Sequence, residues 1–447
     1  MTAVGPARKR IHLAALPHAG PRADGLAPDG GGPVGRSGPG GTPRLALPSY
    51  ESYESYERVA RTAERGLFDF LLLAGGRFPR EPEGRVPDAD PVGPEPVAAL
   101  SALAAVTERL GLAATVDASC NEPYEVARRL ATLDHLSEGR AAWHLVTSAD
   151  ATTGGNFRRG GGLDRAERYP RTAEFAAAAR RLWDSWTPQG EAGPVAYRGR
   201  HFDIAGEFTV PRPPQGHPVL IQTGDSDEGR EFAAATADVV CCGRNIAGRP
   251  PAGPGARLGP LEAARAFYAD VKRRLRRYGR APDDLKVMPA VGVVLGDTAA
   301  EARERAAELI GPPVPPPADP DAWAEPDAWS EPGAWSEPGA WTDPWAGNEA
   351  WTAADGRTAT RARTVIEAGR RPCFVGTPEA VAAELDAYVR RDAADGFVLV
   401  PHVVPGALQE FVDRVVPLLQ ERGAFRTEYR GATLRSHLGL GAPARKD

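Results

Sequence analysis

The sequence predicts an α/β protein, specifically a (β/α)8 TIM barrel with insertions. From Tyr50 to Gln420, short apolar segments alternate with longer segments whose apolar residues fall on one helical face. Helices of this length between buried strands imply a parallel sheet with right-handed crossovers, and there are about eight strand–helix pairs, as a closed barrel needs. Barrels with insertions exceed about 400 residues. We therefore expect residues 1–447 to form a single domain.

Each predicted strand is a run of mainly apolar residues, and each predicted helix carries an apolar stripe beside polar positions. The predicted strands are 11–16, 68–73, 112–116, 141–146, 219–222, 287–295, 373–375 and 396–400. The predicted helices are 50–64, 97–108, 125–136, 168–186, 228–237, 261–277, 299–309, 378–390 and 408–420. The polar segment between residues 186 and 219 is expected to leave the barrel as a short excursion.

The pattern is clearest in the unit that runs from Glu125 to Ser148. The helix expected at its start should end near Gly139, because glycine is the residue that most often terminates a helix. The strand that follows is apolar apart from His144, and Thr147 and Ser148 come at its C-terminal end. Parallel barrels place their active sites at that end of the strands, so these polar side chains are expected to contact a ligand.

Two segments interrupt the alternation. Residues 17–48 are rich in glycine and proline, which predicts a long loop. Gly30, Gly32 and Gly35 within it have the GxGxxG spacing, but Pro33 interrupts the motif and no strand precedes it, so a nicotinamide-binding domain is not expected.

The second interruption, residues 311–356, repeats a six-residue unit. Trp323, Trp329, Trp335 and Trp341 stand in register, and a proline follows each of them by three positions. Proline at every sixth residue forbids a regular helix. We expect an insertion that is disordered, and the alternative is a lid or docking segment.

Composition argues against several classes of function. The net charge of -5 and the lack of a basic cluster in the sequence argue against a nucleic-acid partner. No run of 18 apolar residues and no signal peptide is recognisable, which predicts a cytoplasmic protein without a membrane span. Cys241 and Cys242 are adjacent whereas Cys120 and Cys373 stand alone, which is neither a disulfide framework nor the spacing of metal ligands. No metal site is therefore expected.

A phosphate site is predicted where the strand at 219–222 meets the next helix. Ser226 and the backbone amides of 227–229 stand at the start of that helix. Such an end offers unpaired N–H donors and a partial positive charge, which suit a phosphate group. The alternative is a capped helix that binds no ligand.

Several sequence blocks resemble the bacterial luciferase-like flavin monooxygenases, in particular the branch that acts on nitrilotriacetate, pristinamycin precursors and dibenzothiophene sulfone. The blocks are RTAERGLFDFLLLA (61–74), ALAAVTERLGLAAT (102–115), NEPYEVARRLATLDHLSEGRAAWHLVTS (121–148), ERYPRTAEFAAAARRLWDSW (167–186), PRPPQGHPVLIQTGDSDEGREFAAATADVV (211–240), FYADVKRRLRRYGRAPDDLKVMPA (267–290), GTPEAVAAEL (376–385) and GAFRTEYRGATLRSHLGL (423–440). They follow one another in the order of the family.

The resemblance implies a luciferase-like barrel and an FMN-dependent two-component monooxygenase. In this family a separate NAD(P)H:flavin reductase delivers reduced FMN, which reacts with dioxygen so that one oxygen atom enters a small organic substrate. It also implies a homo-oligomer. Two alternatives remain open: a deazaflavin-dependent oxidoreductase of the same superfamily, and a catalytically degenerate barrel that still binds flavin.

The resemblance also implies roles for residues near the FMN phosphate. Ser226 takes the place of the phosphate ligand, with Arg230 as an additional contact. Tyr169 matches a tyrosine that binds the flavin in relatives. Arg165 stands where relatives usually have a histidine, and it keeps a positive charge near the phosphate.

Around the flavin ring the sequence departs from the family. Gly75 stands where relatives have an aspartate, and His144 replaces the asparagine of the family's WNVVTS, of which Thr147 and Ser148 are kept. Either Thr115 or Asp117 is expected to face the ring edge. The residues expected to surround the ring are Gly75, Thr115, Asp117, Thr147 and His144.

Two histidines are the candidate catalytic residues. His144 is favoured by its strand and its polar neighbours. His18 is the second candidate, because relatives carry a Gly-His-His segment after the first strand and this chain has only His12 and His18 there. A histidine near neutral pKa is suited to exchange a proton with a bound flavin or substrate.

Overall fold

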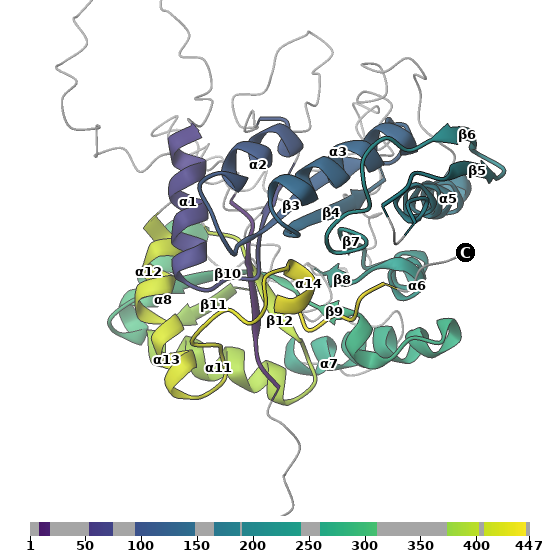
Figure 1. The fold of residues 1–447 in the computed structure, drawn as a ribbon. Coiled ribbons are helices and arrows are strands. Elements are labelled where there is room, and N and C mark those ends of the chain that lie inside the picture. The colour runs from purple at the N-terminus through teal and green to yellow at the C-terminus, as the bar shows by residue number, and fades with distance from the viewer. Residues whose placement is uncertain are drawn as a thin grey trace, which may run out of the picture.

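The fold was obtained as a computed structural model, which describes residues 9–17, 53–74, 94–147, 165–187, 190–242, 260–310, 373–401 and 406–443. Its helices and strands alternate along the chain, with the helices arranged around the sheet (Figure 1). Our expectations for residues 18–48 and 311–356 lie outside these ranges.

The strands are short and almost all apolar. They are β1 (His12–Ala15), β2 (Phe70–Leu73), β3 (Gly111–Asp117), β4 (Ala141–Val146), β5 (Pro194–Arg198), β6 (Asp203–Glu207), β7 (Val219–Thr223), β8 (Val239–Cys241), β9 (Lys286–Val287), β10 (Ala290–Leu295), β11 (Cys373–Gly376) and β12 (Gly396–Leu399). All but β5 and β6 form one parallel sheet, in the order β11-β10-β12-β1-β2-β3-β4-β7-β8-β9.

The helices follow the strands. They are α1 (Tyr53–Arg65), α2 (Pro96–Ala104), α3 (Pro123–Leu136), α5 (Arg165–Asp184), α6 (Asp227–Thr236), α7 (Pro260–Leu275), α8 (Ala299–Ile310), α11 (Pro378–Arg390), α12 (Gly406–Arg414), α13 (Val416–Glu421) and α14 (Leu434–His437), with 3-10 turns η1 (Arg276–Tyr278) and η2 (Pro282–Asp284). The end predicted for α3 is confirmed, because Gly139 has a φ of +90° and donates its N–H to the carbonyl of Asp134 at 2.8 Å.

The sheet curls so that the segment around Pro289 lies between β8 and β12. The N–H of Met288 donates to the carbonyl of Val240 in β8, and the N–H of Val398 in β12 donates to the carbonyl of Pro289, both at 2.9 Å. Pro289 itself has no N–H to give to a ladder. The single strand predicted at 287–295 is therefore wrong in detail, since the structure divides it into β9 and β10.

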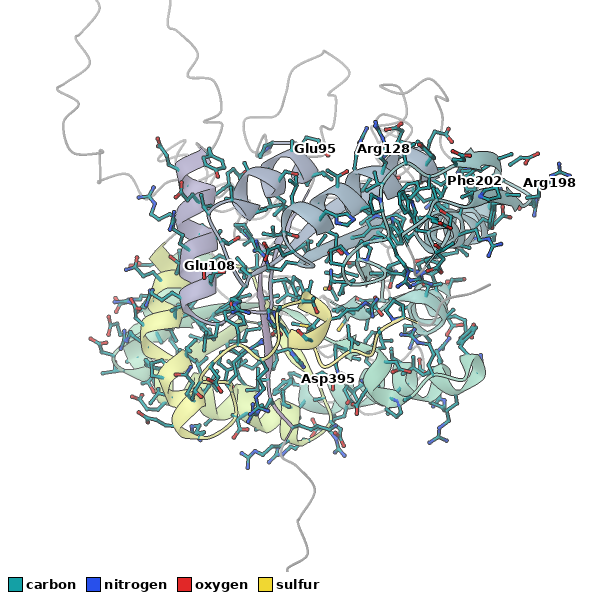
Figure 2. All side chains as sticks on the ribbon, in the orientation of Figure 1. Glu95, Glu108, Arg128, Arg198, Phe202 and Asp395 are labelled. Atoms are coloured by element: carbon teal, nitrogen blue, oxygen red, sulfur yellow. The ribbon has the colours of Figure 1, made fainter. Side chains whose placement is uncertain are left out.

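Proline also explains a second correction. The helix predicted at 408–420 is two helices, α12 and α13, and Pro417 stands in the first turn of α13. The helix predicted from residue 168 begins earlier, at Arg165, and contains Pro170. The short strand β8 was not predicted, nor was the antiparallel hairpin of β5 and β6, which the polar segment forms outside the main sheet. Figure 2 shows Arg198 of this hairpin at the edge of the molecule.

Side chains alternate between two cores. Those on the outer face of the sheet pack against the helices in one large cluster. Those on the inner face form a smaller apolar cluster that includes Ala113 of β3, Ala142 of β4 and Ile221 of β7. Leu434 and Leu438 belong to the inner cluster too, so the C-terminal segment covers the end of the sheet where the strands begin.

None of the described helices is long and apolar enough to cross a membrane. Within the same residues, no group of three or more histidine, cysteine or acidic side chains is arranged to hold a metal ion.

Candidate functional site

The inner face of the sheet becomes polar at the C-terminal ends of β3, β4 and β7. Because side chains alternate, the residues two positions beyond Ala113, Ala142 and Ile221 face the same way. They are Thr115, His144 and Thr223. Three adjacent parallel strands thus place a hydroxyl, an imidazole and a hydroxyl side by side.

Hydrogen bonds hold His144 between the two threonines. Its Nδ1 lies 2.9 Å from Oγ1 of Thr115, and its Nε2 lies 2.7 Å from Oγ1 of Thr223. A hydroxyl can donate or accept, so the two threonines accommodate either neutral tautomer of the ring. The side chain of His144 is half-buried. The arrangement is that of an oriented group able to take up or release a proton.

Asp117 and Thr147 lie farther out on the same edge of the sheet. Asp117 ends β3 on the inner face, and its Oδ1 accepts the N–H of Ser119 at 2.5 Å. Thr147 directly follows β4 and is half-buried. The structure therefore brings Thr115, Asp117, His144 and Thr147 to one edge, and Thr115 is the one in contact with His144. That they surround a flavin ring stays a prediction.

The helix N-terminus predicted to bind phosphate is present. Ser226 is the N-cap of α6, and its Oγ accepts the N–H of Gly229 at 3.1 Å. A Cβ atom on Gly229 would lie 2.9 Å from Oη of Tyr169 and 3.2 Å from Oγ of Ser226. The ring of Tyr169 packs against Phe232, with centroids 5.6 Å apart. The hydroxyls of Tyr169 and Ser226 thus lie next to Gly229 at the N-terminus of α6. Because Gly229 has no side chain, the space between the two hydroxyls is not filled by a Cβ atom.

A second glycine, Gly224, and a buried amide border this turn. A Cβ atom on Gly224 would lie 2.6 Å from Nε2 of Gln222. Nε2 donates to the carbonyl of Thr223 at 2.7 Å, while the buried Oε1 of Gln222 has no hydrogen-bond partner among the described residues. A buried acceptor without a partner favours a bound polar group at this position. The turn therefore fits a phosphorylated ligand that also carries hydroxyl donors, as FMN does.

Arg230 does not point freely into this site. Its Nη1 donates to Oδ2 of Asp270 on α7 at 2.8 Å, and its Nε donates to the carbonyl of Ser226 at 3.4 Å. A phosphate contact by Arg230 stays a prediction. It requires the guanidinium to donate to the phosphate as well as to Asp270. The backbone of Arg165 forms the first residue of α5, and a phosphate contact by its side chain stays a prediction.

Cys241 also faces the inner core, one strand beyond Thr223. Burial raises the pKa of its thiol to about 12, so it stays protonated at neutral pH and is not a nucleophile. Gly75, His18 and Ser148 lie outside the described residues, and their roles stay predictions.

Thr223 and Gln222 were not singled out from the sequence, and Gly229 was included only for its backbone amide. The alternation of Val219, Ile221 and Thr223 on a buried strand was the available signal for Thr223. The close approach of Tyr169 to Gly229 joins two helices distant in the sequence, and no local pattern reveals it.

Comparison with known proteins identifies the family of the chain. Residues 33–395 match the family model of the luciferase-like monooxygenases. Nitrilotriacetate monooxygenase component A from Aminobacter aminovorans is 37% identical over 86% of this chain and 89% of its own length. Dibenzothiophene-sulfone monooxygenase from Rhodococcus erythropolis is 36% identical over 86% of this chain and 89% of its own length. These matches confirm the branch that the sequence blocks indicated.

Solved structures show the same fold. An EDTA monooxygenase from Chelativorans sp. BNC1 superposes with a TM-score of 0.70 and 26% identity, over 97% of this chain and 99% of that one. A riboflavin lyase, solved with modified FMN and riboflavin, superposes with a TM-score of 0.71 and 24% identity, over 97% of each chain.

Proposed function

Because the chain belongs to the luciferase-like monooxygenase family, we propose that it is a two-component monooxygenase that uses reduced FMN and dioxygen to oxygenate a small organic molecule. The observation that carries the proposal is the convergence of Tyr169 and Ser226 on Gly229 at the N-terminus of α6. A phosphomononucleotide is the cofactor whose anionic end suits that turn.

The residues of the turn would bind and orient the cofactor. The hydroxyls of Ser226 and Tyr169 donate to the phosphate, and the first amides of α6 add their partial positive charge. Oε1 of Gln222 is the acceptor available to a ribityl hydroxyl. Arg165 and Arg230 contribute positive charge nearby. Binding at this end fixes the ring at the polar edge formed by β3, β4 and β7.

The second group of residues would act at the flavin ring. Bound reduced FMN supplies the two electrons with which one atom of dioxygen enters the substrate while the other leaves as water. His144, held by Thr115 and Thr223, is the proposed group that holds or moves a proton there. Asp117, Thr147 and Gly75 are proposed to border the ring, and His18 is proposed as a second catalytic residue.

We also propose that the curled sheet is a (β/α)8 barrel in one domain. In this interpretation β9 and β10 are a single strand interrupted at Pro289, bonded to β8 on one side and β12 on the other. The barrel would then have eight strands, with β11 added outside beside β10. A homo-oligomer and an NAD(P)H:flavin reductase as transient partner complete the proposal.

The test of this function has two stages. The purified protein is titrated with oxidised FMN, reduced FMN and a deazaflavin, and the fluorescence of each cofactor is followed. Bound reduced FMN is then mixed with labelled dioxygen and either nitrilotriacetate or dibenzothiophene sulfone, substrates of relatives. Transfer of label to a substrate supports the proposal. Preference for the deazaflavin supports the first alternative, and FMN binding with all the dioxygen released as hydrogen peroxide supports a degenerate barrel.

Replacing Gly229 with alanine is expected to weaken FMN binding by about tenfold, which corresponds to the loss of about one hydrogen bond to a charged group. The new methyl group would displace the hydroxyl of Tyr169 from the turn. Alanine favours the helix, so stability should not fall. Gly406→Ala is the matched control, because its new Cβ would have no atom within 4 Å. If a fluorescence titration gave the two variants equal affinities for FMN, Tyr169 would not be a ligand of the phosphate.

A further inference from the structure

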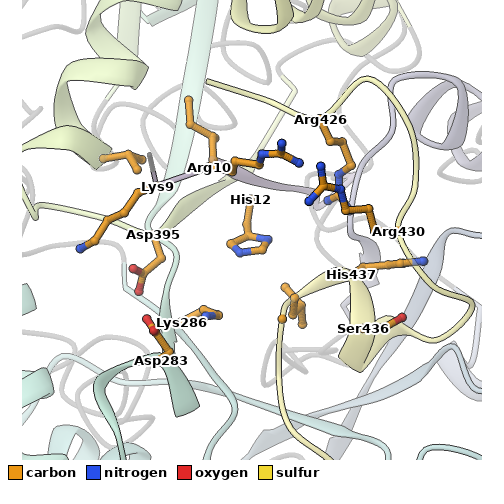
Figure 3. Close-up of a pocket in the computed structure, with 14 residues that line it drawn as sticks. Lys9, Arg10, His12, Asp283, Lys286, Asp395, Arg426, Arg430, Ser436 and His437 are labelled. Atoms are coloured by element: carbon orange, nitrogen blue, oxygen red, sulfur yellow. The ribbon is translucent and has the colours of Figure 1, made fainter. Parts of the chain in front are cut away.

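Figure 3 shows a pocket whose lining includes residues at the beginnings of several strands. His12 begins β1, Lys286 begins β9 and Asp395 directly precedes β12, and all three line it. In a parallel sheet the strands begin at the edge opposite to the one where they end. This pocket of about 330 Å³ is therefore separate from the candidate flavin site. We refer to it as the basic pocket.

The basic pocket has more positive than negative charge. Its cationic lining residues are Lys9, Arg10, Lys286, Arg426 and Arg430, and its acidic ones are Asp283 and Asp395. Two of the cations are already paired, Lys9 with Asp392 and Arg426 with Asp69. Arg10, Lys286 and Arg430 form no ion pair with any described residue.

Lys286 carries the inference furthest. Its side chain is only 7% exposed, yet the structure gives its Nζ no hydrogen-bond partner among the described residues. Lys272, a neighbouring lysine that is half-buried, has the partners that such a group usually has. Its Nζ donates to the carbonyls of Pro282 and Leu285 and to Oδ2 of Asp395, at 2.8, 2.5 and 2.7 Å. Because Nζ of Lys286 has no partner among the described residues and its side chain lines the pocket, an anion bound there would supply the missing counter-charge.

His437 adds a second polar atom without a partner. Its Nδ1 is buried and makes no hydrogen bond with the described residues, and its Nε2 lies 3.4 Å from the carbonyl of Gly431. Burial lowers the pKa of His437 to about 4, so the ring is neutral at physiological pH and has a single N–H, which Nδ1 carries only in the tautomer that gives up the long Nε2 contact with Gly431. The ring lines the same cavity as Lys286.

The charge balance indicates the type of anion. Asp395 is compensated by Lys272, just as Asp69 and Asp392 compensate Arg426 and Lys9. The remaining charged lining residues are three cations, Arg10, Lys286 and Arg430, and one carboxylate, Asp283. The pocket therefore has two positive charges that no carboxylate in its lining balances. Arginine forks and a lysine around one centre suit the oxygens of a phosphate group. A cavity of this volume holds a small ligand.

We propose that the basic pocket binds a dianionic phosphate group, either inorganic phosphate or a small phosphate monoester. The ligand joins Arg10 before β1, Lys286 on β9 and Arg430 of the C-terminal segment. Because these three parts of the chain are far apart in sequence, binding stabilises the folded state. The inference does not depend on the proposed monooxygenase activity.

Thermal unfolding of the full chain tests it, with inorganic phosphate compared with chloride at equal ionic strength. The measurement is made in the Ser226→Asp background, so that phosphate cannot bind at the N-terminus of α6. A saturable rise in Tm with phosphate is the expected result. Lys286→Met should weaken phosphate binding by about tenfold or more, because a hydrogen-bonded charge is lost. Without phosphate this variant should unfold at no lower a temperature than its parent, because it removes one of three neighbouring positive charges.

Two further variants make the test specific. Arg430→Gln, at an exposed position, should also weaken phosphate binding without affecting the fold. Arg198→Met removes a charge from the exposed β5–β6 hairpin and should leave the phosphate effect unchanged (Figure 2). The proposal is overturned if phosphate and chloride give the same Tm, or if Lys286→Met binds phosphate as tightly as its parent. A phosphate monoester that shifts Tm more than inorganic phosphate would identify the ligand as organic.

Discussion

Replacing Ser226 with aspartate is expected to lower the affinity for FMN by about a hundredfold or more, because like charges brought together at a binding site cost several kcal/mol. Aspartate is as good an N-cap as serine, so its carboxylate should still accept the N–H of Gly229 and keep α6 intact. The carboxylate would occupy the place where the phosphate is proposed to bind. The variant thus separates cofactor binding from folding.

A second N-cap provides the control for this variant. Thr377 caps α11 in the same way, with its Oγ1 accepting the N–H of Ala380 at 3.4 Å. Thr377→Asp adds the same charge at the start of another helix and should leave FMN affinity within about twofold of the parent. Isothermal titration of both variants gives the comparison. An unchanged affinity in Ser226→Asp would place the phosphate elsewhere and remove the observation on which the proposed function depends.

The sequence predicted most elements because their apolar patterns are local. The helix at 378–390 was predicted at the bounds that the structure gives, and α3 differs from its prediction only at its start. Errors occurred where a proline or a short run weakened the pattern. Pro289 divided one predicted strand and Pro417 divided one predicted helix, whereas β8 was too short to be recognised.

The candidate site was predictable where it depends on one strand or one helix end. Their places near the C-terminal ends of two predicted strands were enough to expect Thr115 and His144 at the same edge, although the choice between Thr115 and Asp117 stayed open. Pairings between distant segments were not predictable. The interaction of Arg230 with Asp270, and the unpartnered Nζ of Lys286, depend on which helices and strands become neighbours in the folded chain.

The two ends of the sheet differ for a physical reason. At the C-terminal ends the inner face is polar, and β3, β4 and β7 present side chains that a neutral ring system can contact. At the N-terminal ends Leu434 and Leu438 of the C-terminal segment fill the inner core. The polar side chains at this end therefore lie beside that segment, where they line the basic pocket. The two proposed binding sites therefore share no residues.

Replacing Arg140 with methionine is expected to reduce the free energy of unfolding by about 4 kcal/mol, because several buried acceptors lose a charged donor at once. The guanidinium is 4% exposed and uses all of its N–H groups. Nε donates to the carbonyl of Ser137, Nη1 to Oγ1 of Thr107 and the carbonyl of Leu110, and Nη2 to the carbonyls of Ala104 and Thr107, at 2.7 to 3.1 Å. Arg140 thus joins the end of α3 to the end of α2.

The matched control lies on the same helix. Arg128 of α3 is exposed and pairs with Glu125 three residues earlier, so Arg128→Met should change stability by no more than about 0.5 kcal/mol. Urea unfolding followed by tryptophan fluorescence compares the two variants. Arg140→Lys should fall between them, because an ammonium offers three donors and no planar fork. If Arg140→Met unfolded at the same urea concentration as Arg128→Met, the acceptors of Thr107 and Ser137 would have found other donors. The buried guanidinium would then not be what holds the strand β4, and with it His144, in place.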